Sequence, residues 1–256
     1  MQPLLGTFVE IGVNSDFPNC ELAVDQAFHK IRDVHKNLSF QSKDSELTVL
    51  NNSLGRSIKL SRNTVTIIRL GKIMTRFSNC YFNCTVGNYF SDNVSIQFAG
   101  DDSDISIDGH QVKLNSNIRI ILDGIAKGFA VDLAICSLKK SGATQGWVNA
   151  GGDLRVFGNN EWPVFVKGID GKTRVSLKLR NAAIATSNVS MNEVSERFPS
   201  RVIPSFENEL EGGTWSVVAK TAWRADCLTK VAANAPFTQR VDIVRRLGGE
   251  LLWAGG

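Results

Sequence analysis

Proline and glycine are too few in this chain to build a fibrous or disordered protein. Its 256 residues include only 6 Pro and 22 Gly, and they contain no internal repeat and no low-complexity tract. Collagen-like, repetitive and largely disordered proteins are therefore excluded. What is present is ordinary for a globular protein, with 43% hydrophobic and 21% charged residues. A chain of this length can bury a core without disulfide or metal staples.

Cysteine is scarce, and its number is odd. Because the five cysteines are widely spread, a disulfide framework is not expected. Only Cys80 and Cys84 are close in sequence, and without a second ligand pair this spacing is more typical of two buried thiols than of a metal site. Reduced thiols suit a cytoplasmic protein. The full set is Cys20, Cys80, Cys84, Cys136 and Cys227.

Long apolar runs and a strong charge of one sign are also missing. The N-terminus has no basic segment, apolar core or lipobox cysteine, and no later stretch approaches the roughly 18 apolar residues of a membrane span. The sequence thus predicts a cytoplasmic protein with no membrane span, although a periplasmic protein whose leader was removed would look the same. With 29 Lys+Arg against 25 Asp+Glu and no basic run, a nucleic-acid partner is not expected.

Hydrophobic periodicity predicts short strands interrupted by a few long helices, which is typical of an α+β fold. No linker or composition shift divides the chain, so residues 1–256 are predicted to form a single domain, in which the polar stretch 187–213 is irregular. Helices are expected over residues 21–38, 65–77, 128–138 and 224–235. Strands are expected over residues 7–13, 94–98, 105–107, 111–114, 118–122, 147–149, 154–157, 164–166, 175–179, 182–186 and 215–219.

Small and polar residues gather in three places where a plain core would be bulky. The first is Leu122-Asp-Gly-Ile-Ala-Lys-Gly-Phe-Ala-Val-Asp132, which reads as a strand end running through glycines into a helix. Free backbone amides at a helix start favour anions, and Lys127 adds a charge that could meet a phosphate. Because the spacing matches neither a Walker A loop nor GxGxxG, a tight turn with a solvated lysine is the alternative.

The second place is Trp147-Val-Asn-Ala-Gly-Gly-Asp153. Gly151 and Gly152 would allow another backbone or a ligand to approach closely, while Asn149 and Asp153 supply hydrogen-bonding groups. A bulged strand and turn would produce the same pattern.

The third place is Ala225-Asp-Cys-Leu-Thr-Lys230, with Asp226 near a helix start and Thr229 one turn later. A carboxylate, a hydroxyl and backbone carbonyls can hold Mg²⁺ beside a diphosphate. The alternative is that Asp226 is an N-cap.

Taken together, these clusters and four further segments resemble the ApbE family of FAD:protein FMN transferases, long labelled thiamine biosynthesis lipoproteins. The resemblance runs from residue 6 to about residue 235, with the pieces in the family's order. They are Gly6-Thr-Phe-Val-Glu10, the stretch from Asp44-Ser-Glu-Leu47 to Asn51, Phe82-Asn-Cys-Thr-Val-Gly87, Asp123-Gly-Ile-Ala-Lys-Gly-Phe-Ala-Val-Asp132, Val148-Asn-Ala-Gly-Gly-Asp153, Ala185-Thr-Ser187 and Ala225-Asp226.

The resemblance implies an ApbE-like fold of mostly antiparallel or mixed sheets with a few long helices. It also implies an enzyme that takes FAD as substrate and, with Mg²⁺, transfers FMN to a Ser or Thr of an acceptor flavoprotein subunit. Charge on the diphosphate would then be neutralised by the cation, Lys127 and backbone amides. By position, the nucleotide would meet Gln41, Phe82, Asn83, Asp123, Lys127, Val202 and Lys230, and the metal would meet the Gly124 carbonyl, Asp226 and Thr229.

Several family residues are replaced here. The expected catalytic histidine falls on Ser200 and a nearby aspartate falls on Ile203, while none of His29, His35 and His110 is close in sequence. The metal-binding threonine expected four residues after Asp226 falls on Lys230, where a lysine could neutralise the diphosphate in place of part of the metal site. Another family aspartate falls on Ile121, and Asp123 is close enough to substitute for it.

Three functions follow from this pattern. The first is an FMN transferase with a remodelled site, in which Asp226 and Ser200 stand at the catalytic positions, or an enzyme that splits FAD into FMN and AMP with water as acceptor. The second is a catalytically degenerate protein that binds FAD. The third is a partner-binding accessory that has lost the nucleotide, as the apolar Ile121 and Ile203 would favour.

Overall fold

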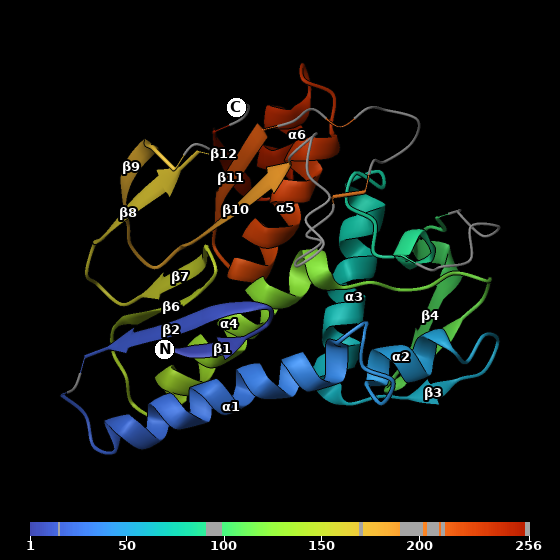
Figure 1. Ribbon diagram of the computed structural model, residues 1–256, viewed down its shortest axis with the longest axis horizontal. Coiled ribbons are helices and arrows are strands. Elements are labelled where there is room, and N and C mark those ends of the chain that lie inside the picture. Colours follow the sequence, from blue (N-terminus) through green and yellow to red (C-terminus); the bar gives the residue numbers. More distant parts are fainter. Residues whose placement is uncertain are drawn as a thin grey trace.

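The structure, a computed structural model, describes residues 1–14, 16–90, 99–168, 171–189, 202–203, 210 and 213–253. Figure 1 shows two regions along the long axis of the molecule: a large sheet with its covering helices, and a small sheet beside a long helix. Mixed helices and antiparallel sheets confirm the α+β prediction. Among the helices described, none is both long and apolar enough to cross a membrane.

Seven strands form the main sheet, and every neighbouring pair in it is antiparallel. It pairs strands that are far apart in the chain, since β2 lies beside β6 and β7 beside β10, and the strands from the two ends of the sequence form its opposite edges. In spatial order, the strands are β1 (Gln2–Leu4), β2 (Thr7–Val13), β6 (Gly146–Ala150), β7 (Asp153–Phe157), β10 (Ala183–Val189), β11 (Gly213–Ala219) and β12 (Gly249–Trp253).

Two smaller antiparallel sheets lie at opposite sides of the molecule in Figure 1. One is a hairpin formed by the segment that connects β7 to β10, with the strands β8 (Trp162–Lys167) and β9 (Thr173–Leu179). The other has the spatial order β3 (Ile58–Lys59), β5 (Gln111–Leu114) and β4 (Ile105–Asp108).

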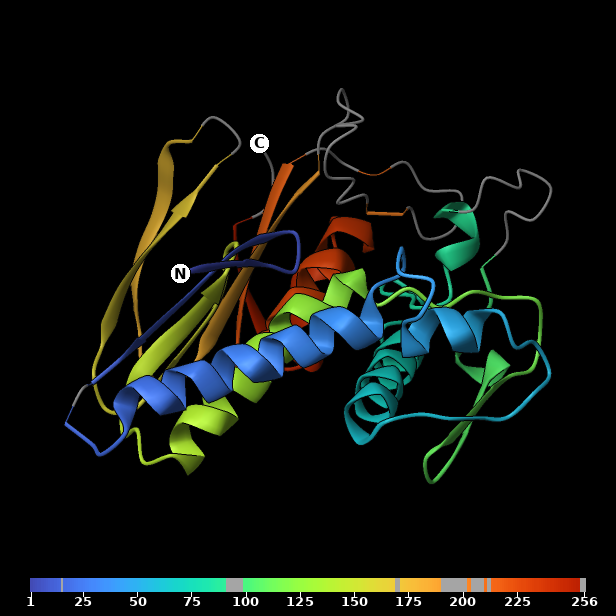
Figure 2. The ribbon, with the colours of Figure 1, turned by 60° about the horizontal axis from the view of Figure 1, so that its bottom comes forward.

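In the described part of the chain, six α-helices lie between and beside the sheets. The central one is α4 (Asp123–Lys140), which lies between α1 (Cys20–Leu38) and the main sheet in both ribbon views (Figures 1 and 2). It also packs against α5 (Ala222–Asn234), which covers β10 and β11. The remaining helices are α2 (Glu46–Asn51), α3 (Arg62–Phe77) and α6 (Arg240–Arg246), with short 3₁₀ turns η1 (Gly87–Phe90) and η2 (Asp102–Asp104).

Helices with one apolar face were predicted well. In α1 the buried positions Ala27, Ile31, Val34 and Leu38 recur at helical spacing, as expected from the sequence. Helix α3 begins a few residues before the predicted start because the Ser61 hydroxyl caps it, accepting a hydrogen bond from the Thr64 amide at 3.4 Å.

Helix α4 begins earlier than the predicted start at Gly128. Its first turn closes on the Leu122 carbonyl, which accepts hydrogen bonds from the amides of Ile125 and Ala126 at 2.9 and 2.8 Å. The helix is apolar on most sides, and ten of its residues are buried. Such a pattern marks a helix enclosed by other elements rather than one lying on the surface. The two glycines, Gly124 and Gly128, are therefore helical and not part of a preceding loop.

The strand predicted over residues 118–122 is wrong. The segment is extended and mostly buried, but it makes only a single bridge, from Arg119 to Val86. Its polar groups find other partners: the Asn51 side chain donates to the Ile120 carbonyl at 2.8 Å and accepts from the Ile120 amide at 2.7 Å. On the side of residues 84–87, the Ile121 amide donates to the Cys84 carbonyl and the Gly87 amide donates to the Arg119 carbonyl, both at 2.9 Å, so the segment is held by a single bridge and an amide side chain rather than by a strand ladder.

Other differences concern short or irregular elements. The predicted irregular stretch 187–213 is in fact strand at both described ends, since β10 continues to Val189 and β11 starts at Gly213. Several short elements were not predicted from the sequence, namely the strands β1, β3 and β12 and the helices α2 and α6. Strand β8 is longer than its predicted range. The predicted strand over residues 94–98 lies outside the described residues.

Candidate functional site

A cavity of about 1820 Å³ opens where the two regions of the molecule meet. Its walls come from the C-terminal end of α1, the loops that follow α3, the first turn of α4, the end of β10 and one face of α5. Typical small-molecule sites enclose about 300 to 1,000 Å³, so there is room for a ligand as large as a dinucleotide.

All seven residues predicted to bind the nucleotide line this one cavity. They come from separate parts of the chain, and folding alone brings them together. Asp226 and Thr229 are fully buried and reach the cavity only through neighbours such as Lys230. Ser200 lies outside the described residues. The predicted residues that line the cavity are Gln41, Phe82, Asn83, Asp123, Gly124, Lys127, Val202 and Lys230.

The floor of the cavity is built by two helices that exchange carboxylate contacts. Asp226 of α5 accepts a hydrogen bond from the Gly128 amide of α4 at 3.1 Å. In return, Asp132 of α4 accepts from the amides of Ala222 and Trp223, at 3.0 and 2.9 Å, and so caps the start of α5. These contacts tie the two helices into one rigid unit beneath the cavity.

Gly128 is needed for this crossing rather than for a ligand. A Cβ at this position would lie 2.3 Å from the Ala222 carbonyl oxygen, so only glycine lets the helices approach so closely. Its amide, which the sequence suggested could meet a phosphate at a helix start, is instead bonded to Asp226. The backbone amides expected to be exposed at the start of this helix therefore do not include that of Gly128.

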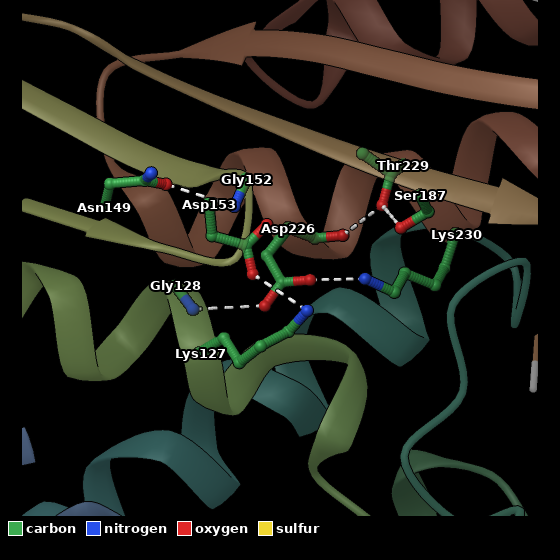
Figure 3. Close-up of polar contacts among 9 residues, drawn as sticks. All are labelled: Lys127, Gly128, Asn149, Gly152, Asp153, Ser187, Asp226, Thr229 and Lys230. Atoms are coloured by element: carbon green, nitrogen blue, oxygen red, sulfur yellow. Dashed lines mark hydrogen bonds and ion pairs between the residues drawn. The ribbon is translucent and has the colours of Figure 1, made fainter. Parts of the chain in front are cut away.

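The alternative assignment of Asp226 as an N-cap is wrong as well. Helix α5 begins at Ala222 after Thr221, which places Asp226 inside the helix. Its side chain has no exposed surface, and besides Gly128 it pairs with the Lys230 ammonium one turn later (Figure 3). Each carboxylate oxygen therefore has a partner from the protein itself.

Thr229 points away from the carboxylate that it was predicted to assist. Its hydroxyl donates to the Asp226 main-chain carbonyl at 2.7 Å. It also lies 2.7 Å from the Ser187 hydroxyl (Figure 3). Because the Thr229 hydroxyl has already donated its hydrogen, Ser187 is the donor in this second contact. This chain of bonds anchors α5 to the end of β10, on the cavity wall.

A second ion pair joins α4 to the tip of the β6–β7 hairpin. The Lys127 ammonium lies 3.3 Å from the Asp153 carboxylate, whose side chain is almost fully buried (Figure 3). Asp153 is the main reason why the pKa of Lys127 is raised above its usual value. Burial, followed by the nearby charge of Asp226, raises the pKa of Asp153 to about 6, although Lys127 opposes this shift.

The turn that presents Asp153 depends on its two glycines. Gly151 and Gly152 have φ values of 61° and 100°, and they connect the paired residues Ala150 and Asp153 as a two-residue hairpin turn. Asn149 holds the turn by accepting a hydrogen bond from the Gly152 amide at 3.1 Å. The predicted close approach is real at Gly151, where a Cβ would lie 2.3 Å from the Thr7 hydroxyl.

Asp123 opens α4 at the cavity surface. Desolvation by the cavity walls raises its pKa, and Asp226 adds to this effect, whereas Lys127 and Lys230 oppose it. Asp123, Asp153 and Asp226 thus share one electrostatic environment with two lysines. Within the part of the chain that the structure describes, however, no three His, Cys, Asp or Glu side chains converge in a way that could hold a metal.

The donor set predicted for Mg²⁺ does not fit a divalent cation. Mg²⁺ needs near-octahedral oxygen ligands and usually keeps several waters. Asp226 is enclosed and paired with an ammonium, and the Thr229 hydroxyl is engaged elsewhere. Of the predicted metal ligands, only Gly124 lies on the cavity surface.

Asn83 spends most of its hydrogen-bonding capacity on the protein. Its side chain donates to the Gly100 carbonyl at 2.8 Å and accepts from both the amide and the hydroxyl of Thr85, at 2.9 and 2.8 Å. One amide hydrogen is left to face a ligand. Its evident structural contribution is to hold the loop after α3 against residues 99–101.

The sequence analysis missed much of the apolar wall of the cavity. Four aromatic residues besides Phe82 line it, and the rings of Phe40 and Phe90 meet edge to face with centroids 6.3 Å apart. Tyr81, Tyr89 and Phe90 lie within eight residues of Phe82, so this aromatic cluster in the sequence could have indicated part of the wall, whereas Phe40 is distant in sequence. His35 also lines the cavity, and its Nδ1 accepts a hydrogen bond from the Leu5 amide at 3.3 Å. The four aromatics are Phe40, Tyr81, Tyr89 and Phe90.

The fold is shared with several solved structures. Over 97% of this chain and 91% of the other, it superposes on the ApbE protein from Thermotoga maritima with a TM-score of 0.80 at 21% identity. The flavinyl transferase ApbE from Pseudomonas stutzeri has a TM-score of 0.75 at 18% identity, over 95% of this chain and 89% of that one. For the flavin transferase ApbE from Vibrio cholerae the TM-score is 0.76 at 18% identity, over 98% and 94% of the two chains.

Sequence comparisons place the chain more directly. A search of curated protein sequences returned no match. The family model described as "ApbE family" matches residues 5–252, nearly the whole chain. This match spans both regions of the fold and every wall of the cavity, so the protein belongs to the ApbE family.

Proposed function

We propose that this protein transfers FMN from FAD to a Ser or Thr hydroxyl of a partner protein. The observation that carries the proposal is the cavity in which Lys127 and Lys230 face the same space as an aromatic wall. Flavin and adenine rings need flat apolar surfaces, whereas the diphosphate between them needs positive charge. Membership of the ApbE family, and the flavin transferases among the similar structures, support the same reaction.

The reaction is a phosphoryl transfer. The acceptor hydroxyl oxygen forms a bond to the phosphorus on the FMN side, and the bond from that phosphorus to the bridging oxygen breaks. AMP leaves with the bridging oxygen and its electron pair, and the hydroxyl proton passes to a base and then to solvent. With water as acceptor, the same steps would yield FMN and AMP.

Two lysines would neutralise the diphosphate. Charge builds on the non-bridging and leaving oxygens during such a transfer, so fixed cations beside them lower the barrier. Lys127 is 31% exposed and Lys230 18% exposed, which leaves both ammonium groups within reach of a ligand in the cavity. Asp226, buried beneath them, would act as a positioning residue that holds Lys230 and the Gly128 backbone.

Asp123 is our candidate for the base. It lines the cavity and lies in the same electrostatic environment as both lysines, and desolvation raises its pKa above the usual value, which favours its uptake of a proton. Replacing it in the variant Asp123→Asn should lower turnover by about 10²- to 10⁴-fold with little loss of FAD affinity. Unchanged turnover would remove Asp123 from this role and leave Ser200, which the sequence placed at the catalytic position, as the next residue to test.

Binding and turnover can be tested separately. We expect the purified protein to bind FAD close to one equivalent, measured from the visible spectrum, and to release AMP when an acceptor peptide with a Ser or Thr flavinylation motif is added. Lys127→Gln should weaken FAD binding by about tenfold or more, because a charged partner of the diphosphate is lost. The matched control is Lys178→Gln, since Lys178 is 71% exposed on β9 and pairs only loosely with Glu161 at 3.6 Å.

The outcomes distinguish the three functions considered. FAD binding without AMP release, with or without acceptor, would indicate a flavin-binding protein that lacks catalysis. Absence of FAD binding would indicate a nucleotide-free accessory. Because the cavity takes residues from Leu5 to Asn234, we further propose that residues 1–256 act as one FAD-binding domain.

A further inference from the structure

We propose that the ammonium of Lys230 is the resident cation of this site, so that the protein binds the FAD diphosphate without a divalent metal. The inference rests on the proposed function and deepens it. It starts from the disagreement between the donor set that the family resemblance implies and the one that the structure has. In place of a ligand hydroxyl one turn after Asp226, this chain carries a positive charge.

The first step is that Asp226 has no free oxygen. One oxygen accepts the Gly128 amide at 3.1 Å and the other pairs with the Lys230 ammonium. The side chain has no exposed surface, so a metal could reach it only by displacing Lys230, and it would then lack space for its own waters. Asp226 therefore cannot bind a metal while Lys230 keeps its observed position.

The second step is that the ammonium can serve a ligand while it holds Asp226. Lys230 lines the cavity and its side chain is 18% exposed. An ammonium has three hydrogens, and only one is needed for Asp226. Gly124 keeps the approach open, since a Cβ there would lie 3.5 Å from Lys230 Cε and 3.2 Å from the Phe82 ring.

The side chain of Lys230 is already ordered by contacts within the protein. It extends along one turn of α5 to its own Asp226, and α5 is anchored through the Ser187–Thr229 contact and through Asp132. A flexible surface lysine gains little from a ligand because its side chain must first be ordered, whereas this one is already ordered.

The experiment compares Lys230→Thr with the wild-type protein in excess EDTA and in excess MgCl₂. Thr at this position removes the ammonium and uncovers an Asp226 oxygen, with a hydroxyl one turn away, which creates the oxygen donors that Mg²⁺ needs. Lys230→Arg keeps the charge, and Lys178→Thr is the same change on the exposed hairpin. FAD affinity is measured by quenching of flavin fluorescence, and Mg²⁺ binding to the FAD-free proteins is measured by thermal unfolding.

For wild type, Lys230→Arg and Lys178→Thr, we expect the FAD affinity of each protein to be the same in EDTA as in MgCl₂. Lys230→Thr should lose about tenfold to a hundredfold in FAD affinity in EDTA, and MgCl₂ should restore part of it. MgCl₂ should raise the unfolding temperature of FAD-free Lys230→Thr and leave that of wild type unchanged.

Two results would overturn the inference: FAD binding by wild type that is lost in EDTA, or a wild-type unfolding temperature that rises with MgCl₂ as much as that of Lys230→Thr. If wild type binds no FAD in either buffer, the proposed function fails. The unfolding temperatures would then still decide whether Lys230 occupies the place of a metal. Should Lys230→Thr fail to fold, Lys230→Arg and the wild-type measurements in the two buffers keep the test decisive.

Discussion

The two lysines of the cavity differ in how the protein holds them. Lys127 reaches from α4 across to Asp153 on a hairpin tip, at 3.3 Å and without hydrogen-bond geometry at the Asp153 oxygen. Lys230 and Asp226 belong to the same helix, and that carboxylate is bonded on both oxygens. The first pair can exchange partners when a ligand enters, whereas the second is part of the helix crossing. Charges that look alike in sequence therefore divide into a responsive pair and a structural pair.

Removing the charge of Asp226 should have the largest effect on the fold. Asp226→Asn leaves Lys230 without its carboxylate in a mostly buried place, and breaking a buried pair on one side costs about 3–5 kcal/mol of unfolding free energy. Urea denaturation measures this directly. A loss below about 1 kcal/mol would mean that the Asp226–Lys230 pair stabilises the fold no more than an exposed ion pair does.

The responsive pair should reveal itself through pH. The pKa of Asp153 is raised to about 6 from its ordinary 3.8, so the folded state holds this proton more tightly than the unfolded state does. The resulting stabilisation is complete below about pH 3.8 and is lost as pH rises through about 6. At about 1.36 kcal/mol for each tenfold change in proton affinity, it amounts to at most about 3 kcal/mol.

Comparison with Asp153→Asn isolates this contribution, because the other carboxylates cancel between the two proteins. We expect the unfolding free energy of wild type, minus that of the variant, to decrease between about pH 4 and pH 6. A difference that is flat over this range, or that increases, would contradict a raised pKa at Asp153.

The helix crossing itself can be tested at Gly128. In Gly128→Ala the new Cβ would meet the Ala222 carbonyl at 2.3 Å, so α4 and α5 must move apart, at an expected cost of about 1–3 kcal/mol. Gly124→Ala is the matched change, since its nearest contact is the Phe82 ring at 3.2 Å. We expect that variant to unfold nearly as wild type does in urea while its FAD affinity falls. An equal loss of unfolding free energy in both variants would show that the α4–α5 contact at Gly128 tolerates an added methyl group no less well than the Gly124 position does.

The smallest effect should come from an exposed pair of the same kind. Asp242 and Arg245 of α6 lie 3.4 Å apart, with side chains 81% and 75% exposed. Asp242→Asn should change the unfolding free energy by less than about 1 kcal/mol. A larger loss would indicate that charge pairs on this protein cannot be ranked by burial.

Sequence patterns were most reliable where structure is local. The apolar spacing of α1 and α3, the alternating sequence of β2 and the glycine pair of the β6–β7 turn each depend on a few neighbouring residues, and the structure has all of these elements. The pattern failed at residues 118–122, where apolar residues predicted a strand. There the Asn51 side chain bonds to both main-chain groups of Ile120, and residues 84–87 make only a single bridge to the segment.

By itself, the sequence determined the longer helices, most of the strands and the ordered motifs that led to the ApbE family, because all of these depend on short-range spacing. Only the tertiary structure decided what the motif residues do. Gly128 and Asp226 are 98 residues apart, and their contact gives Gly128 its role in the crossing of α4 and α5. The same packing buried Asp226 and directed Lys230 onto it, since the burial and the partner of a charge depend on residues brought together from the whole chain.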